Sequence, residues 1–162
     1  MRVGRLLPTA LAAALVAACT NTPPPPAPPQ APPGKSLVQV YRDLDWKGRD
    51  LSFAVERNGM VIGTLGEGSY FHDIVPPGRH YYRAYPAGEL PADDDRGAFV
   101  EARPGSTHYV RLVPQETAAG YTARMFVSFE QQALDAMKHL SPAPDQRREQ
   151  AFEPAPPRSG SR

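Results

Sequence analysis

The first side chains that could do chemistry in this sequence are four histidines: His72, His80, His108 and His139. Imidazole nitrogens bind zinc and copper, and metal sites usually show close spacings such as HxH, HExxH or a Cys-x-x-Cys pair. None of these spacings occurs here. The sequence therefore predicts no bound metal and no cofactor. A cluster of His72, His80 and His108 across neighbouring strands is the alternative, as a metal-binding or enzymatic site.

Catalytic motifs are also missing, because the sequence has no GxSxG nucleophile elbow. We therefore predict a protein that is not an enzyme. Tyr81, Arg83 and Tyr85 alternate along one segment, so they share one face of an extended strand. Exposed tyrosine and arginine side chains recognise protein or sugar partners, and these three residues form the candidate binding surface. Cross-strand packing at a sheet edge is the structural alternative for them.

The single cysteine, Cys19, ends a short apolar run that begins at Leu6 and follows Arg2 and Arg5. Basic residues, a short apolar stretch and small residues before a cleavage point are typical of a secretory signal peptide. The apolar run is too short to cross about 30 Å of hydrocarbon as a helix. One cysteine cannot form a disulfide within the chain, so a disulfide-stapled scaffold is excluded.

The tetrapeptide Val16-Ala17-Ala18-Cys19 resembles the lipobox of bacterial lipoproteins. The resemblance implies cleavage between Ala18 and Cys19, transfer of diacylglycerol to the Cys19 thiol and acylation of the new amino terminus. Cysteine suits this chemistry because it is the strongest side-chain nucleophile near neutral pH. Several acyl chains give stable membrane anchoring. Because Thr20 follows rather than aspartate, the resemblance also implies the outer membrane, with the protein facing the periplasm.

Proline and aromatic residues divide the chain into parts. Most of the 20 prolines lie near the two ends, whereas the aromatic residues gather in the middle. Consecutive prolines lack N–H donors and favour an extended polyproline II linker, and a tail rich in Pro, Gln, Arg and Glu is typical of disorder. We predict a signal peptide (1–18), a lipidated Cys19 with a Pro-rich linker (19–35), a folded domain (36–141) and a disordered tail (142–162).

Charge is balanced, with 18 Lys and Arg residues against 17 Asp and Glu residues. Proteins that bind nucleic acids usually carry a basic excess on one face, and no such cluster appears here. The sequence therefore predicts no nucleic-acid partner. The length of 162 residues supports one folded domain.

Several short segments alternate in polarity and are separated by turn residues, which predicts β-strands. The Asn58-Gly59 pair between two apolar segments is the strongest short hairpin signal, and Pro77-Gly78 and Pro104-Gly105 suit type II turns. The expected strands are 37–42, 51–56, 60–65, 69–75, 79–85, 97–102, 106–113 and 121–129.

Seven or eight strands at this spacing predict an all-β fold, an antiparallel β-sandwich of the Ig-like or transthyretin-like kind. A small barrel is the alternative. Helical spacing appears only in residues 130–140, where Leu134, Met137 and Leu140 can lie on one face.

Five motifs occur in a fixed order along the chain: Val38–Arg42, Asn58-Gly59 with Ile62–Leu65, Gly68–Phe71, Pro77–His80 and Pro104–Leu112. This order resembles a known family of small bacterial lipoproteins and periplasmic proteins whose domain has no known function. It is also distantly similar to PEGA-type modules. The resemblance implies a cell-envelope protein with a β-sandwich over roughly residues 36–130. We therefore expect a non-catalytic module, either structural or binding a protein or glycan partner, that meets the membrane through Cys19.

Overall fold

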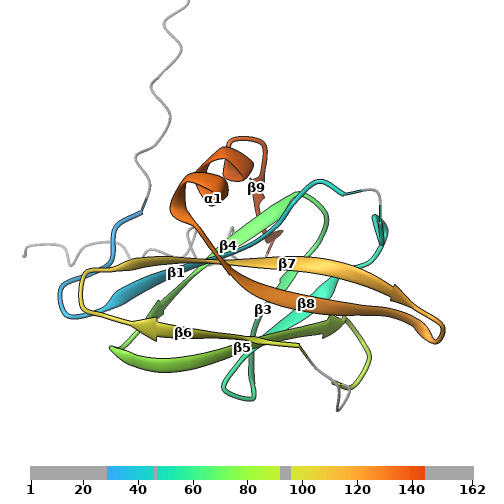
Figure 1. The fold of residues 1–162 in the computed structure, drawn as a ribbon, viewed down its shortest axis with the longest axis horizontal. Coiled ribbons are helices and arrows are strands. Elements are labelled where there is room, and N and C mark those ends of the chain that lie inside the picture. Colours follow the sequence, from blue (N-terminus) through green and yellow to red (C-terminus); the bar gives the residue numbers. More distant parts are fainter. Residues whose placement is uncertain (1–28, 46, 92–95, 145–162) are drawn as a thin grey trace, which may run out of the picture.

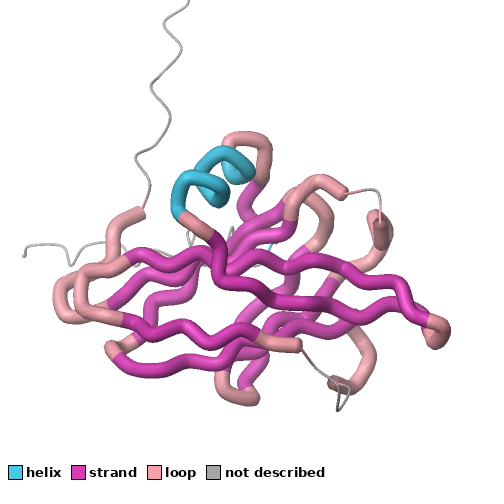
Figure 2. Tube along the Cα trace, viewed as in Figure 1, coloured by secondary structure: helices cyan, strands magenta, loops and turns pink. Residues whose placement is uncertain are grey.

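Two β-sheets packed face to face form the domain in the computed structural model, which describes residues 29–45, 47–91 and 96–144 (Figures 1 and 2). The predicted signal peptide, Cys19 and most of the predicted linker and tail lie outside these residues, so these assignments stay predictions. The strands are β1 (Ser36–Arg42), β2 (Phe53–Arg57), β3 (Met60–Leu65), β4 (Ser69–Val75), β5 (Gly78–Pro86), β6 (Ala98–Ala102), β7 (Thr107–Thr117), β8 (Gly120–Ser128) and β9 (Ser141–Pro142).

The first sheet has the order β8-β7-β1-β4-β9 and the second the order β3-β2-β5-β6. The predicted all-β sandwich is confirmed, and β1 to β8 follow the expected segments closely. The barrel alternative is wrong, because the two sheets do not close on each other among the described strands. Two pairings are parallel, β1 with β7 and β4 with β9. Parallel pairing requires a long connection, and the chain between β1 and β7 provides one by building the whole second sheet.

Alternation along the strands sorts the side chains between core and surface. In β5, Tyr82 and Ala84 point inward and are fully buried, whereas the neighbouring Tyr81 and Arg83 are only partly buried. The inward residues join Val40 of β1 and other apolar side chains in one core between the sheets. This period of two places every second β5 residue on the outer side of the second sheet.

The two sheets are joined on one side, where edge strand β6 of the second sheet lies next to edge strand β8 of the first sheet. An isolated parallel bridge links Arg96 to Arg124, and the Met125 N–H donates to the Arg96 carbonyl at 2.9 Å. These contacts fix the start of β6 next to β8.

The helix α1 (Glu130–Met137) covers the outer side of the first sheet (Figure 1). Ala133 is fully buried against Tyr41 and Tyr109, while Leu134 remains 36% exposed. The face of α1 that packs on the sheet therefore begins at Ala133 rather than at Leu134. It continues through the partly buried Met137 and Leu140.

After α1 the chain returns to the first sheet. β9 pairs with the start of β4, and Ala143 is 1% exposed within the core. The packed part of the chain thus continues past residue 141, the expected end of the domain.

Candidate functional site

The predicted binding residues Tyr81, Arg83 and Tyr85 lie together on the outer side of the second sheet. The register places Arg83 opposite Glu56 of β2 and Tyr81 opposite Phe99 of β6. These side chains form one continuous surface over three strands. We call it the outer β5 face, and it comprises Glu56, Arg79, Tyr81, Arg83, Tyr85, Phe99 and Glu101.

Glu56 is the centre of one half of this face. Its side chain is only 7% exposed, and both carboxylate oxygens are bound. Arg83 Nε lies 2.5 Å from Glu56 Oε2, and the Tyr85 hydroxyl donates to Glu56 Oε1 at 2.8 Å. A carboxylate with so little exposure is stable only when it is paired and hydrogen-bonded. The contacts therefore hold Arg83 and Tyr85 in fixed positions.

A β-bulge helps to aim Glu56. The register between β2 and β3 shifts after Val55, which pairs with Gly63, whereas Glu56 pairs with Val61. Ile62 is thus the extra residue on β3. Bulges twist a strand locally and redirect side chains, often near functional positions.

The other half of the face is aromatic and more exposed. The rings of Tyr81 and Phe99 are 4.8 Å apart with an interplanar angle of 42°. The Arg79 guanidinium lies 4.0 Å above the Phe99 ring, and Arg79 Nε is 3.3 Å from Glu101 Oε1. Phe99 is 52% exposed. This half presents an aromatic ring and a cation to solvent at the same place.

Gly97 makes room for Tyr81. Its N–H donates to the Tyr81 hydroxyl at 3.2 Å. A Cβ atom at Gly97 would lie 2.4 Å from both Tyr81 Cζ and the Tyr82 carbonyl oxygen, which is far below a normal contact. The glycine is therefore required for the close approach of the tyrosine ring.

A hollow of about 410 Å³ opens beside Tyr85 at the far end of the face. Tyr121, Leu90, Glu89 and Thr122 are among the residues that line it. Its mixture of aromatic and polar groups continues the outer β5 face beyond β5.

Sequence reasoning missed Glu56 and Phe99. Glu56 follows Phe53 and Val55 in a segment of alternating polarity. The sequence therefore indicates that the Glu56 side chain points away from the core. Its pairing with Arg83 depends on the β2–β5 register, which no local pattern reveals.

The structure does not bring the three candidate metal-binding histidines together. His72 lies on the outer side of the first sheet beside the Tyr70 ring, at a centroid distance of 5.3 Å. His80 is buried in β5 with Nε2 at 2.8 Å from the Pro76 carbonyl, and His108 Nε2 is 2.9 Å from Ser106 Oγ. Within residues 29–45, 47–91 and 96–144, no three His, Cys, Asp or Glu side chains are placed to hold a metal ion.

Two of these histidines have pKa values that differ from the ordinary value of the imidazole group. Burial lowers the pKa of His72 below its ordinary value of 6.5. Burial, with a smaller contribution from the Arg103 charge, lowers the pKa of His108 as well. Both effects disfavour the imidazolium form.

A polar link that the sequence did not reveal joins the two sheets. Asp73 of β4 forms an ion pair with Arg57 of β2 and accepts a hydrogen bond from the Tyr82 hydroxyl at 2.8 Å. Burial, together with the Asp73 charge, raises the pKa of Tyr82. Asp73, Arg57 and Tyr82 therefore connect the two sheets inside the sandwich.

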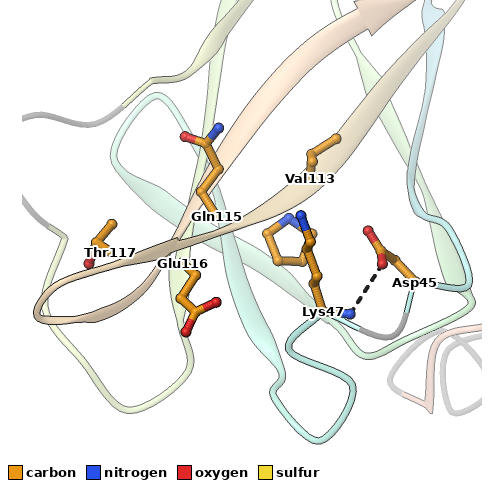
Figure 3. A pocket seen from close by; sticks show the side chains of 7 residues that line it. Asp45, Lys47, Val113, Gln115, Glu116 and Thr117 are labelled. Atoms are coloured by element: carbon orange, nitrogen blue, oxygen red, sulfur yellow. Dashed lines mark hydrogen bonds between the residues drawn. The ribbon is translucent and has the colours of Figure 1, made fainter.

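Figure 3 shows a second hollow, about 380 Å³ in volume, between the loop after β1 and strand β7. The Lys47 N–H donates to Asp45 Oδ1 at 3.1 Å, and Glu116 and Thr117 complete its polar lining. No nucleophile with an adjacent base lies among its lining residues.

The loop beside that hollow is positioned by Arg42, which is fully buried at the end of β1. Its Nη1 donates to the Leu51 carbonyl and its Nη2 to the Gly48 carbonyl, each at 2.6 Å. Burial lowers the pKa of this guanidinium, and the carbonyl oxygens compensate for part of the lost hydration.

A scan against protein-family models finds no family that matches this chain, and a search of curated proteins finds none of similar sequence. The resemblance to small lipoproteins and to PEGA-type modules therefore stays a prediction. Within the described part of the chain, no helix has the length and apolar character needed to cross a bilayer.

Proposed function

We propose that this protein is a lipid-anchored, non-catalytic binding module of the cell envelope, with the outer β5 face as its recognition surface. The observation that carries the proposal is the fixed arrangement of Arg83 and Tyr85 around Glu56, beside the exposed Phe99 and Arg79. Positions that are held in place before binding lose less conformational entropy when a partner docks.

A protein partner fits this face best. Aromatic residues and arginine are enriched in the energetic centres of protein interfaces. The two arginines of the face are matched by the carboxylates of Glu56 and Glu101, so the surface has no net charge to attract a polyanion. A neutral glycan is the competing ligand, and the experiment below separates the two.

The recognition surface is tested by crosslinking in cells, with Phe99→Ser and Arg79→Ala compared against Leu44→Ser. Phe99 and Leu44 are both large apolar side chains with more than half of their surface exposed. Loss of one crosslinked protein in the first two variants alone would support the proposal. Equal crosslinking in all three variants would contradict it, and binding of the purified protein to envelope glycans alone would identify a glycan ligand.

The anchor is tested at Cys19. Substitution Cys19→Ala removes the thiol that would receive diacylglycerol, so incorporation of a fatty-acid analogue should fall to background. The variant should also retain residues 1–18 and migrate as a longer chain. Undiminished labelling of the variant would reject lipidation at this residue.

A further inference from the structure

Phe129 is a large aromatic side chain held in water at the junction between β8 and α1. It is 85% exposed, although its backbone is fixed, because its carbonyl accepts a hydrogen bond from the Ala133 N–H at 3.0 Å. The preceding residue is also fixed, since Ser128 Oγ accepts a hydrogen bond from the Tyr41 hydroxyl at 3.0 Å. An exposed aromatic ring indicates a contact surface when further exposed apolar side chains lie on the same side of the molecule.

Three further exposed apolar side chains lie on the same side of the molecule. Ile74 of β4 pairs with Leu37 and alternates with Tyr70 and His72, which places it on the outer side of the first sheet. Leu134 is on α1, which covers that side. With Phe129 they form what we call the α1 surface: Ile74 (52% exposed), Phe126 (44%), Phe129 (85%) and Leu134 (36%).

The N-terminal segment reaches the sheet close to this surface. Ser128 pairs with Tyr109, and Tyr109 pairs with Gln39, so β8 ends near the end of the sheet where β1 begins. The Gly105 N–H donates to the Lys35 carbonyl at 2.7 Å and fixes the start of β1 at that end. In Figure 1 the described residues before β1, drawn in blue, lie at this end of the first sheet, on the side of α1.

The length of chain before β1 limits how far the domain can move from an anchor. The proposed lipid is attached at Cys19, and the predicted linker covers residues 19–35. Seventeen residues span at most about 60 Å when fully extended. A tether of this length keeps the domain at a high effective concentration near the bilayer. Even a weak contact between the domain and the bilayer is then formed for much of the time.

We propose that the α1 surface docks on the lipid bilayer that holds the Cys19 anchor, with Phe129 inserted at the water–lipid interface. The proposal rests on the lipid anchor of the proposed function. Docking in this orientation directs the outer β5 face, on the opposite sheet, away from the membrane toward a soluble partner. The exposed charges beside this surface include Glu130 and Asp135 of α1, Lys138 directly after α1, which pairs with Asp135 at 2.6 Å, and Arg124, whose guanidinium lies 5.9 Å from the Phe126 ring centroid. Arg124 can meet lipid phosphate while the apolar side chains enter the interface, and the zwitterionic vesicles used below test whether this contact forms without anionic lipid.

The experiment uses the full lipidated chain with the substitution Phe129→Cys, labelled with a small fluorophore. Lipidation consumes the thiol of Cys19, so the introduced cysteine is the only reactive one. The matched control is Leu90→Cys, because Leu90 is 90% exposed and follows β5 at the opposite end of the sandwich. Both proteins are reconstituted into zwitterionic vesicles whose acyl chains carry bromine, a short-range quencher.

We expect quenching at position 129 to exceed that at position 90 by roughly three-fold or more, since only an inserted label contacts acyl chains. In addition, Phe129→Asp should abolish quenching of a label placed by Leu134→Cys. Equal quenching at positions 129 and 90, or none at 129 in protein that floats with the vesicles, overturns the proposal. Failure to float rejects the lipid anchor itself, and with it the proposed docking.

Discussion

At the scale of single residues, the outer β5 face depends on side chains that are more constrained than their surface location implies. Glu56 is nearly buried on the outward side of a sheet and is neutralised by Arg83. Such a pair contributes little net stability, but it fixes geometry, and removal of one partner leaves a charge without compensation.

Replacement of Arg83 should therefore destabilise the domain. We expect Arg83→Met to lower the free energy of unfolding by about 2–3 kcal/mol, because the Glu56 carboxylate would keep only part of its hydrogen bonding. The double variant Arg83→Met with Glu56→Gln should recover most of that loss. Urea unfolding of the wild type, Arg83→Met, Glu56→Gln and the double variant measures these values, and additive losses in the double variant would contradict the coupling.

Gly97 offers a second test at this scale. Gly97→Ala should cost about 1–3 kcal/mol of unfolding free energy, because the new methyl group meets the Tyr82 carbonyl and forces the strands apart. Gly66→Ala is the matched control, since a Cβ there meets no atom within 4 Å. Equal stability of the two variants in thermal unfolding would show that Tyr81 is not tightly seated.

At the scale of elements, the β2–β3 hairpin is fixed by a turn with two positive φ angles, 52° at Asn58 and 83° at Gly59. This is the geometry of a type I′ turn, which matches the twist of the flanking strands. Asn58 also contacts the neighbouring strand, because its Oδ1 accepts the Tyr81 N–H at 2.8 Å. One residue thus shapes the hairpin and attaches it to β5.

Substitutions at Asn58 separate these two roles. Asn58→Ala should destabilise by about 1–3 kcal/mol, because alanine disfavours positive φ and leaves the Tyr81 N–H without its acceptor. Asn58→Gly restores the backbone freedom but not the hydrogen bond, so it should fall between alanine and wild type. Chemical denaturation gives the order, and a glycine variant as unstable as alanine would assign the whole effect to the hydrogen bond.

The elements themselves were predictable where local pattern decides them. Alternating polarity and turn residues located β1 to β8, and Asn58-Gly59 located the hairpin. The parallel pairing of β1 with β7 was not predictable, because it joins segments about seventy residues apart and leaves no local signal. Helical spacing did not reveal which residue of α1 is most buried, because the small Ala133 fits against two tyrosines whereas the larger Leu134 stays partly exposed. The sequence predicted that Tyr81, Arg83 and Tyr85 share one face of a strand. It did not predict that Glu56 and Phe99 lie beside them, because the strand register brings these residues together.

At the scale of the whole molecule, stability should depend on pH through the two perturbed histidines. The pKa values of His72 and His108 are lowered in the folded state, so below about pH 6.5 the unfolded state binds more protons. Stability is therefore lost as the pH falls through this range and is fully present above it. The same argument applies at the alkaline end to Tyr82, whose raised pKa favours unfolding above about pH 10.

Replacement of His72 by glutamine should reduce the loss of stability between pH 6.5 and pH 5, because glutamine takes up no proton on unfolding. His139→Gln is the control at an exposed position on the turn after α1. Thermal unfolding at several pH values checks the slope. If His72→Gln leaves the change of stability with pH unaltered, His72 does not contribute to the loss of stability at acid pH.

The parallel pairing of β1 with β7 also has a consequence for the order in which the chain can fold. β1 is the first strand to leave any channel that exports the chain from its N-terminus, yet one of its two ladders is made with Thr107–Leu112. The β2–β5 and β5–β6 ladders of the second sheet can form earlier, whereas β1 waits with one side open. Long-range pairings of this kind slow folding and expose unpaired strands. The newly exported domain should therefore depend most on protection from aggregation in the interval before its seventh strand emerges.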